Sequence, residues 1–400
     1  MCLPLLYGAR VLPVPATALL LAFVPLIAFG AIAQTELPTP PPLPDGSWRF
    51  IVSGDSRNCG DIVVPAIAAH GSLFTPSFYW HLGDLRAIYK IDEDIAFNPA
   101  NKSFLKSCEA YQRIAWKDFV ANQIGAFGDL PVYIGIGNHE TIPPKDEDAF
   151  KREFTDWLDQ PTLRHQRELD KEPDQPEPFY HWVQGGVDFI YLDNASDCFS
   201  DQQMAWFRRR LATAKVDVNV KSIVVGMHEA LPGSFSKNHS MGDKPDEPLS
   251  SKSGSEAYAA LLEFRKFKPV YVLASHSHFF MENIYSTPEL SPKGVDPLPG
   301  WIVGTAGAVR SALPDIRPAA PAKSQTDTYG YLMGTVSSNG TIQFDFEEIR
   351  EADVPKYVRE RYPAKSIAWC FEHNSQNKEP KGPDLTLNCK SARVPTCGHP

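Results

Sequence analysis

The chain has 400 residues, of which 43% are hydrophobic and 22% charged, a balance that is typical of a folded globular protein and excludes a fully disordered one. Its formal net charge of −9 excludes the broadly basic surface on which nonspecific binding to nucleic acids or anionic membranes depends. We therefore expect no nucleic-acid partner, and no feature of the composition predicts an oligomeric state.

The first segment has the composition of an export signal. Arg10 is the only charged residue before Glu36, and residues 16–33 are apolar or small throughout. This run ends in Ala31-Ile32-Ala33, an A-x-A cleavage pattern. We predict a signal peptide over residues 1–33, cleaved after Ala33, which implies a secreted or periplasmic protein without a stable membrane span. The alternative is that residues 16–33 remain as a membrane anchor.

Three further segments follow the predicted signal. Residues 34–47 contain five prolines and no core-forming run, which is typical of a stiff polyproline linker. The globular domain is expected to begin at Trp48 and to continue to about residue 350. Residues 351–400 are polar and contain cysteines, so we interpret them as a separate tail.

The cysteines fit an oxidising compartment. Of the seven in the chain, Cys2 would leave with the signal, and the remaining six are an even number. Three of the six lie in the polar, proline-rich end of the chain, where a disulfide-stapled tail is expected because little apolar surface is available. The spacing predicts no pairing and contains no C-x-x-C zinc motif. The six are Cys59, Cys108, Cys198, Cys370, Cys389 and Cys397.

From Trp48 onward, apolar runs alternate with helical patterns, which predicts an α/β fold. The expected strands are Trp48–Ser53, Phe78–Leu82, Val132–Ile136, Val187–Leu192, Ser222–Gly226, Val270–Ala274, Trp301–Thr305, Tyr331–Val336 and Thr341–Phe346. The expected helices are Ile62–His70, Ser103–Phe127, Glu147–Leu158, Asp201–Ala214 and Ser255–Phe267. Asn339-Gly340 indicates a hairpin between the last two strands. Two charged, proline-containing stretches, 143–178 and 234–253, are expected to be surface loops.

Residue types that bind metal ions follow five of the expected strands. Because open α/β sheets place their ligand sites beyond the carboxyl ends of strands, side chains that are distant in sequence can converge there. Each motif alone is weak, since a Gly-Asp after a strand usually makes a turn and a lone histidine is usually structural. The ordered set of five predicts a metal site: Gly54-Asp55-Ser56-Arg57, Gly83-Asp84, Gly137-Asn138-His139-Glu140, Met227-His228-Glu229 and Ser275-His276-Ser277-His278.

These motifs resemble those of the calcineurin-like metallophosphoesterases, which include purple acid phosphatases and many bacterial phosphodiesterases. The family pattern runs D-x-H, G-D, G-N-H-[DE], a lone H, then G-H-x-H. The resemblance spans residues 49 to 347, and Gly137-Asn138-His139-Glu140 is its most specific part. It implies a four-layer α/β/β/α sandwich with two mixed sheets flanked by helices.

The resemblance also implies roles for individual residues. Asp84 is similar to the carboxylate that bridges two metal ions, and His139 to the histidine that contacts phosphate and protonates the leaving group. The remaining ligands of one ion would be Asn138, His228 and His276, and those of the other would be Asp55 and His278.

The implied activity is hydrolysis of small phosphate esters. Two ions of Mn, Fe or Zn would neutralise developing charge while a metal-bound hydroxide attacks phosphorus in a monoester or diester. The alternative is a non-catalytic exported protein that retains the fold and binds a metal ion or phosphate.

Arg57 stands where the family has its first histidine, and a guanidinium cannot ligate a metal ion. Three interpretations follow. Arg57 binds the substrate phosphate beside a thinner first metal site, which we favour because Asp55, Asp84 and His278 remain. Otherwise it replaces the charge of that ion and leaves a single one, or it marks a site without activity. Smaller departures are Ser275 in place of glycine and Ala87 where purple acid phosphatases have tyrosine.

Two interpretations remain open for each of four neighbouring residues. Glu140 and Glu229 either orient the adjacent ligands or lie on the solvated surface. His239 is interpreted as an exposed loop histidine, with a place in the substrate pocket as the alternative. His81, just before the Gly83-Asp84 motif, either packs beneath the site or hydrogen-bonds within it.

Overall fold

The computed structural model describes residues 42–376 except 103, 104, 106, 237, 238, 244–247, 293–295 and 316–321, together with residue 389. All of them belong to the second of the two units into which the chain divides, Pro40–Pro400. The predicted signal peptide, the start of the linker and most of the tail beyond residue 376 lie outside the described residues. Within the described part, no helix combines the length and apolarity needed to cross a bilayer.

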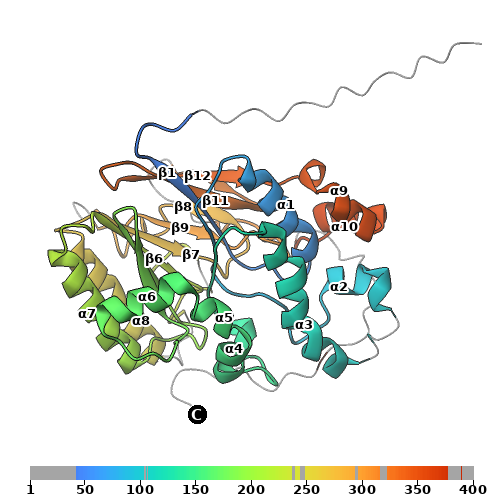
Figure 1. Cartoon of the computed structure of the whole chain (residues 1–400), viewed down its shortest axis with the longest axis horizontal. Helices are drawn as coiled ribbons and strands as arrows, with labels where there is room; N and C mark the ends of the chain where they lie inside the picture. The colour runs from blue at the N-terminus through green and yellow to red at the C-terminus, as the bar shows by residue number, and fades with distance from the viewer. Residues whose placement is uncertain are drawn as a thin grey trace, which may run out of the picture. The chain divides into compact units, whose positions relative to one another are not determined.

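Two mixed β-sheets form the centre of this unit (Figure 1). The first has the order β12-β11-β1-β2-β3, with β1 parallel to β2 and antiparallel to β11. The second has the order β10-β8-β9-β7-β6-β5-β4, and β5, β6, β7 and β9 run parallel within it. The strands of the first sheet are β1 (Trp48–Ser53), β2 (Tyr79–His81), β3 (Val132–Ile134), β11 (Gly330–Val336) and β12 (Ile342–Glu348). Those of the second are β4 (Tyr180–Gln184), β5 (Val187–Leu192), β6 (Ser222–Met227), β7 (Val270–Ala274), β8 (Phe280–Glu282), β9 (Gly300–Val303) and β10 (Ser324–Gln325).

An aromatic core joins the two sheets face to face. Phe50 of β1 lies 5.0 Å, ring centroid to ring centroid, from Phe189 of β5 in an edge-to-face contact. Trp80 of β2 and Trp182 of β4 are 5.3 Å apart in the same geometry. All four side chains are fully buried, so these pairs combine a large apolar area with favourable ring geometry. The sheets therefore form the two inner layers of a sandwich.

Helices cover the outer faces, which confirms the α/β/β/α arrangement expected from the resemblance. In Figure 1, α1 and α3 lie on one flank and α7 and α8 on the other. Phe207 of α7 and Leu261 of α8 share a buried cluster with Val225 of β6. The helices are α1 (Gly60–Ser72), α2 (Glu93–Phe97), α3 (Cys108–Asn122), α4 (Glu147–Glu153), α5 (Thr155–Leu158), α6 (Pro161–Asp170), α7 (Asp201–Val216), α8 (Pro248–Phe264), α9 (Lys356–Arg361) and α10 (Ala364–Glu372).

The stretch 143–178 was predicted as a surface loop apart from the helix Glu147–Leu158. That helix is confirmed by α4 and α5, whereas α6 lies where a loop was expected. These helices are anchored by a few buried apolar residues, among them Phe150, Phe154 and Leu163, within an otherwise charged sequence. Many residues of that stretch are charged because they lie on exposed faces. The buried Leu163 was therefore not recognised as a helix anchor. The described part of the predicted tail is also helical, because α9 and α10 bury Val358, Tyr362 and Trp369.

Two disulfides connect residues of the predicted tail to the globular domain. Cys59 pairs with Cys370 and Cys108 pairs with Cys389, so neither bond joins two tail cysteines. Cys198 is disulfide-bonded as well. The first bond begins directly beside the Arg57 motif and ends in α10, which makes this helix part of the support of that loop.

Candidate metal centre

Three of the predicted site residues adopt a left-handed backbone conformation directly after a strand. The φ angle is 59° at Asp55 after β1, 59° at Asp84 after β2 and 63° at His276 after β7. Non-glycine residues in this region cost free energy on the order of 1 kcal/mol, and such strain concentrates at functional sites. Hydrogen bonds between the turns hold them in place: Asp55 N–H donates to Gly83 O at 2.9 Å, and His276 N–H donates to Asp55 Oδ2 at 2.7 Å.

Four ligand-type side chains converge beyond these strands. His228 Nε2 lies 3.2 Å from Asp84 Oδ1, 3.0 Å from Asn138 Oδ1 and 3.0 Å from His276 Nδ1. Ligand atoms of Asp84, His228 and His276 all lie within 4.8 Å of one another, which makes these three a group that could hold a metal ion. The first two are fully buried.

The hydrogen-bonding roles in this group leave lone pairs facing one another. His228 Nδ1 lies 3.0 Å from the carbonyl oxygen of Leu82, which can only accept, so in the neutral imidazole Nδ1 carries the proton and Nε2 has the lone pair. The Nε2 lone pair then points towards the oxygens of Asp84 and Asn138. Converging acceptors of this kind are stabilised by a cation, and a histidine oriented by a backbone carbonyl is typical of metal ligands. The residues therefore fit a bound ion.

Glu140 fixes the backbone segments that carry the ligand candidates. Its carboxylate accepts hydrogen bonds from the backbone N–H groups of Asp84 at 2.9 Å, Leu85 at 3.0 Å and Gly137 at 2.9 Å. It is fully buried, and burial together with the nearby charge of Asp84 raises the pKa of Glu140 well above its usual value. Of the two sequence interpretations, the orienting role matches these contacts, and Glu140 ties the second motif to the third.

Arg57 lies on the other side of Asp84, among the residues assigned by resemblance to the second ion. Its Nε is 3.4 Å from Asp84 Oδ2, and its terminal NH2 group is 3.0 Å from His278 Nε2. His278 Nε2 is also 3.2 Å from Asp55 Oδ1. Because His278 Nδ1 faces the carbonyl oxygen of Val309 at 2.8 Å, Nε2 is free to accept from the guanidinium.

His139 lies beside the same carboxylate. Its backbone N–H donates to Asp84 Oδ1 at 3.0 Å, and its Nε2 lies 3.6 Å from Asp84 Oδ2. Its ring Nδ1 hydrogen-bonds to Ala87 O at 2.8 Å. Burial and the charge of Arg57 lower the pKa of His139 to about 4, against an opposing effect of Asp84. The structure thus brings all eight sequence-predicted site residues into one connected cluster around Asp84.

Burial would raise the pKa of the Asp84 carboxyl, but the surrounding basic groups reverse that direction. His139, His228 and Arg57 are the main causes that hold it well below its usual value. Arg57 in turn has a raised pKa, because the attraction of Asp84, Tyr89 and Asp55 exceeds the effect of its burial. Asp84 and Arg57 are therefore a buried ion pair at the centre of the cluster.

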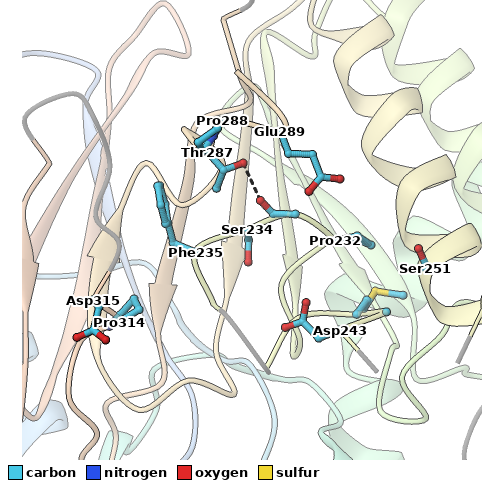
Figure 2. A pocket seen from close by; sticks show the side chains of 13 residues that line it. Pro232, Ser234, Phe235, Asp243, Ser251, Thr287, Pro288, Glu289, Pro314 and Asp315 are labelled. Atoms are coloured by element: carbon cyan, nitrogen blue, oxygen red, sulfur yellow. Dashed lines mark hydrogen bonds between the residues drawn. The ribbon is translucent and has the colours of Figure 1, made fainter. Parts of the chain in front are cut away.

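One cavity adjoins the cluster, and a second cavity shares part of its lining with the first. A cavity of about 180 Å³ is lined by the metal-binding candidates His276 and His278, by His239 and by Phe235. A larger one of about 710 Å³ shares Phe235 and Pro314 with it, and Figure 2 shows these two residues on one side of that space. The ring of His239 lies 5.0 Å from that of His276, so the pocket position weighed for it from sequence matches the structure.

His81 and Glu229 lie away from the cavities. His81 is fully buried, which matches the interpretation that it packs beneath the site. Its ring accepts the backbone N–H of Gly83 at 3.2 Å. Glu229 is buried, and its backbone N–H and carbonyl both bond to Asn194.

Sequence reasoning missed the acidic run Asp92-Glu93-Asp94, which is buried against the Arg57 loop. The backbone N–H of Asn58 donates to Asp92 Oδ1 at 2.6 Å, and Asn58 Nδ2 donates to Glu93 Oε2 at 2.7 Å. A charged run normally indicates a solvated surface. The available signal was its short distance in sequence from Asp84.

The sequence matches no protein-family model and no curated protein. Its structure superposes on purple acid phosphatase PPD1 from yellow lupin (Lupinus luteus) seeds with a TM-score of 0.52 and 13% sequence identity, over 77% of this chain and 52% of that one. The fold is that of the calcineurin-like metallophosphoesterases. This chain spans about half the length of the lupin enzyme.

Two further solved structures match the metallophosphoesterase fold of this chain at lower TM-scores. PhoD matches with a TM-score of 0.47 and 15% identity, over 75% of this chain and 68% of that one. A 5'-nucleotidase from Candida albicans matches with a TM-score of 0.39 and 13% identity, over 82% of this chain and 57% of that one.

Proposed function

We propose that this chain is a metal-dependent phosphoesterase with one metal ion and one fixed guanidinium at its centre. The ion, Mn, Fe or Zn, would be held by Asp84, Asn138, His228 and His276. The observation that carries the proposal is the convergence of these four side chains with their lone pairs facing one another. Carboxylate, amide and imidazole together suit such ions.

The position of Arg57 supports one ion instead of two. Its guanidinium lies between Asp84 and His278, two of the three residues that the resemblance assigns to the second ion. A permanent cation there supplies the charge that a metal ion would otherwise bring. This supports the second of the three interpretations of Arg57, in which the arginine replaces an ion, over the one favoured from sequence alone.

We expect different residues of the chain to contact different parts of the phosphate ester. A bound ion would supply positive charge and lower the pKa of a coordinated water. Arg57 presents further N–H donors to phosphate oxygens, since the guanidinium fork suits that geometry. His139, held by Ala87 O beside Asp84, is placed to contact the phosphate or the departing oxygen.

The substrate class that we propose is small phosphomonoesters or phosphodiesters. The cavity beside His239, His276 and Phe235 would receive the organic part of the ester. We also propose that the protein is exported, because the predicted signal peptide and the disulfides Cys59–Cys370 and Cys108–Cys389 both suit an oxidising compartment.

Two measurements test the proposal. Hydrolysis of p-nitrophenyl phosphate and bis-p-nitrophenyl phosphate with added Mn should be clear in the wild type. It should fall by a factor on the order of a thousand or more in Asp84→Asn, which removes the central carboxylate. A folded wild type that turns over neither ester with Mn, Fe or Zn would refute the enzyme. Elemental analysis should find one ion per wild-type chain and two in Arg57→His. Two ions in both would show that Arg57 replaces none.

A further inference from the structure

The carboxylate of Asp92 is buried between two segments that carry candidate catalytic residues. It stands just before α2, in the loop that follows β2, and its side chain has no exposure to solvent. A buried carboxylate is costly unless hydrogen bonds satisfy it, so its contacts show what it holds.

The first contact of Asp92 is with the loop that bears Arg57. Asp92 Oδ1 accepts the backbone N–H of Asn58 at 2.6 Å. Asn58 is left-handed, with φ at 69°, and follows Arg57 directly. A charge-assisted hydrogen bond to a strained residue fixes the direction in which the preceding side chain leaves the loop.

The second contact is with the segment that orients His139. The backbone N–H of Ala87 lies 3.3 and 3.2 Å from the two oxygens of Asp92. The carbonyl oxygen of the same residue accepts the hydrogen bond from His139 Nδ1 at 2.8 Å. Asp92 therefore bonds to the residue that follows Arg57. It also bonds to Ala87, whose carbonyl oxygen holds the His139 ring.

A third contact orients the carboxylate itself. The hydroxyl of Tyr111, on α3, donates to Asp92 Oδ2 at 2.6 Å. The same hydroxyl also accepts the backbone N–H of Ile88 at 3.1 Å. The neighbouring Asp118 pairs with the buried Arg86, as Asp92 does at 3.9 Å, and accepts from Asn122. Unlike Asp92, it has no hydrogen bond or ion pair within the described chain that reaches Asn58 or Ala87.

We infer that Asp92 is a positioning residue that sets Arg57 and His139 together for the reaction. The inference rests on the proposed phosphoesterase function. It makes the acidic segment after β2 part of the catalytic apparatus, although Asp92 touches neither the substrate nor the candidate ion. Displacement of a catalytic group by about 1 Å can lower a rate by about a hundredfold, so a carboxylate that fixes two such groups has a large effect on turnover.

The test is a double-mutant cycle with p-nitrophenyl phosphate. Asp92→Asn keeps the shape but replaces one acceptor oxygen with a donor, so it should lower kcat by about tenfold or more. In the Arg57→Ala and His139→Ala backgrounds the further loss should shrink to about threefold or less, because one of the two residues that Asp92 sets together is absent. Metal content should remain that of the wild type, since the four ligand candidates are held elsewhere.

Asp118→Asn is the matched control, because it perturbs the same buried cluster without reaching either catalytic segment. Its effect on kcat should be equal in all three backgrounds. If Asp92→Asn does not fold, Tyr111→Phe removes only the hydroxyl that orients the carboxylate and should show the same coupling at a smaller size. An Asp92 or Tyr111 effect that is equal in all backgrounds would overturn the positioning role. If the wild type is active and the variants are uncoupled, the positioning role is refuted and the proposed phosphoesterase function stands. An inactive wild type would refute the positioning role and the proposed function together.

Discussion

Gly137, at the scale of a single residue, illustrates how little space the candidate centre leaves. A Cβ atom added there would lie 2.5 Å from both the backbone nitrogen and Oδ1 of Asp84, and 2.9 Å from Cε1 of His228. Its backbone is extended, so the requirement for glycine is one of space and not of conformation. The glycine of this motif therefore permits the close approach of two ligand candidates.

Gly137→Ala should weaken metal binding because the methyl group pushes Asp84 and His228 apart. We expect a loss of affinity on the order of tenfold to a hundredfold, the size seen when the support of a ligand is disturbed. Titration with Mn followed by calorimetry measures it directly. The control is Gly125→Ala, since a Cβ there meets only Val120 O at an ordinary 3.5 Å. Equal affinities in the wild type and both variants would contradict the packing argument.

The secondary-structure elements differ in how well the sequence predicted them. Strands β1, β5 and β7 have the predicted bounds, because each is a mainly apolar run in which nearly every residue is buried. The short strands β8 and β10 and the helix α6 were missed, since β8 is defined by its pairing with β9 and β10, β10 by its pairing with β8, and α6 buries only Leu163. The site motifs were predicted because each follows a buried strand. Asp92 was missed because its partners, among them Asn58, Ala87 and Tyr111, come together only in the folded chain.

The disulfide Cys59–Cys370 holds the start of α1 to α10. Cys59 also donates its backbone N–H to Gly307 O at 3.1 Å, so the loop beside Arg57 is held on two sides. Replacing both cysteines by serine should lower the free energy of unfolding by about 2–5 kcal/mol. It should also lower kcat more than the matched replacement of Cys108 and Cys389, which pack in a cluster with Ile88 and Tyr111 that contains no residue of that loop. Thermal unfolding and turnover of p-nitrophenyl phosphate, compared between the two variants, check both parts. Equal kcat in the two variants would show that the Cys59–Cys370 bond has no particular effect on the site.

The stability of the whole molecule should depend on pH through a buried histidine remote from the site. His181 of β4 lies between Asp188 at 2.8 Å and Asp170 at 2.6 Å, and thus joins the second sheet to α6. Burial would lower its pKa, but the two carboxylates outweigh burial and raise it to about 9. The raised folded-state pKa means that the stabilisation is complete below the unfolded value of about 6.5 and is lost as pH rises through 9.

Chemical denaturation at several pH values checks this dependence. The wild type should lose about 3 kcal/mol of its unfolding free energy relative to His181→Gln between pH 6.5 and pH 9.5. His165→Gln, which changes an exposed histidine of α6, should follow the wild type. A His181→Gln variant with the same pH dependence as the wild type would contradict the charged pair.

The pairing of β1 with β11 and the bond from Cys59 to Cys370 have a consequence for the order in which the protein becomes active. The loop that carries Asp55 and Arg57 is among the first parts of the globular domain to be synthesised, yet the strand beside it and the cysteine that secures it are separated from it by nearly 280 and by 311 residues. Until β11 has been synthesised and Cys59 has formed its disulfide with Cys370, the nascent chain holds Arg57, the proposed phosphate contact, on an unsupported loop. Hydrolytic activity of the proposed phosphoesterase should therefore appear only after the chain has left the ribosome and met an oxidant.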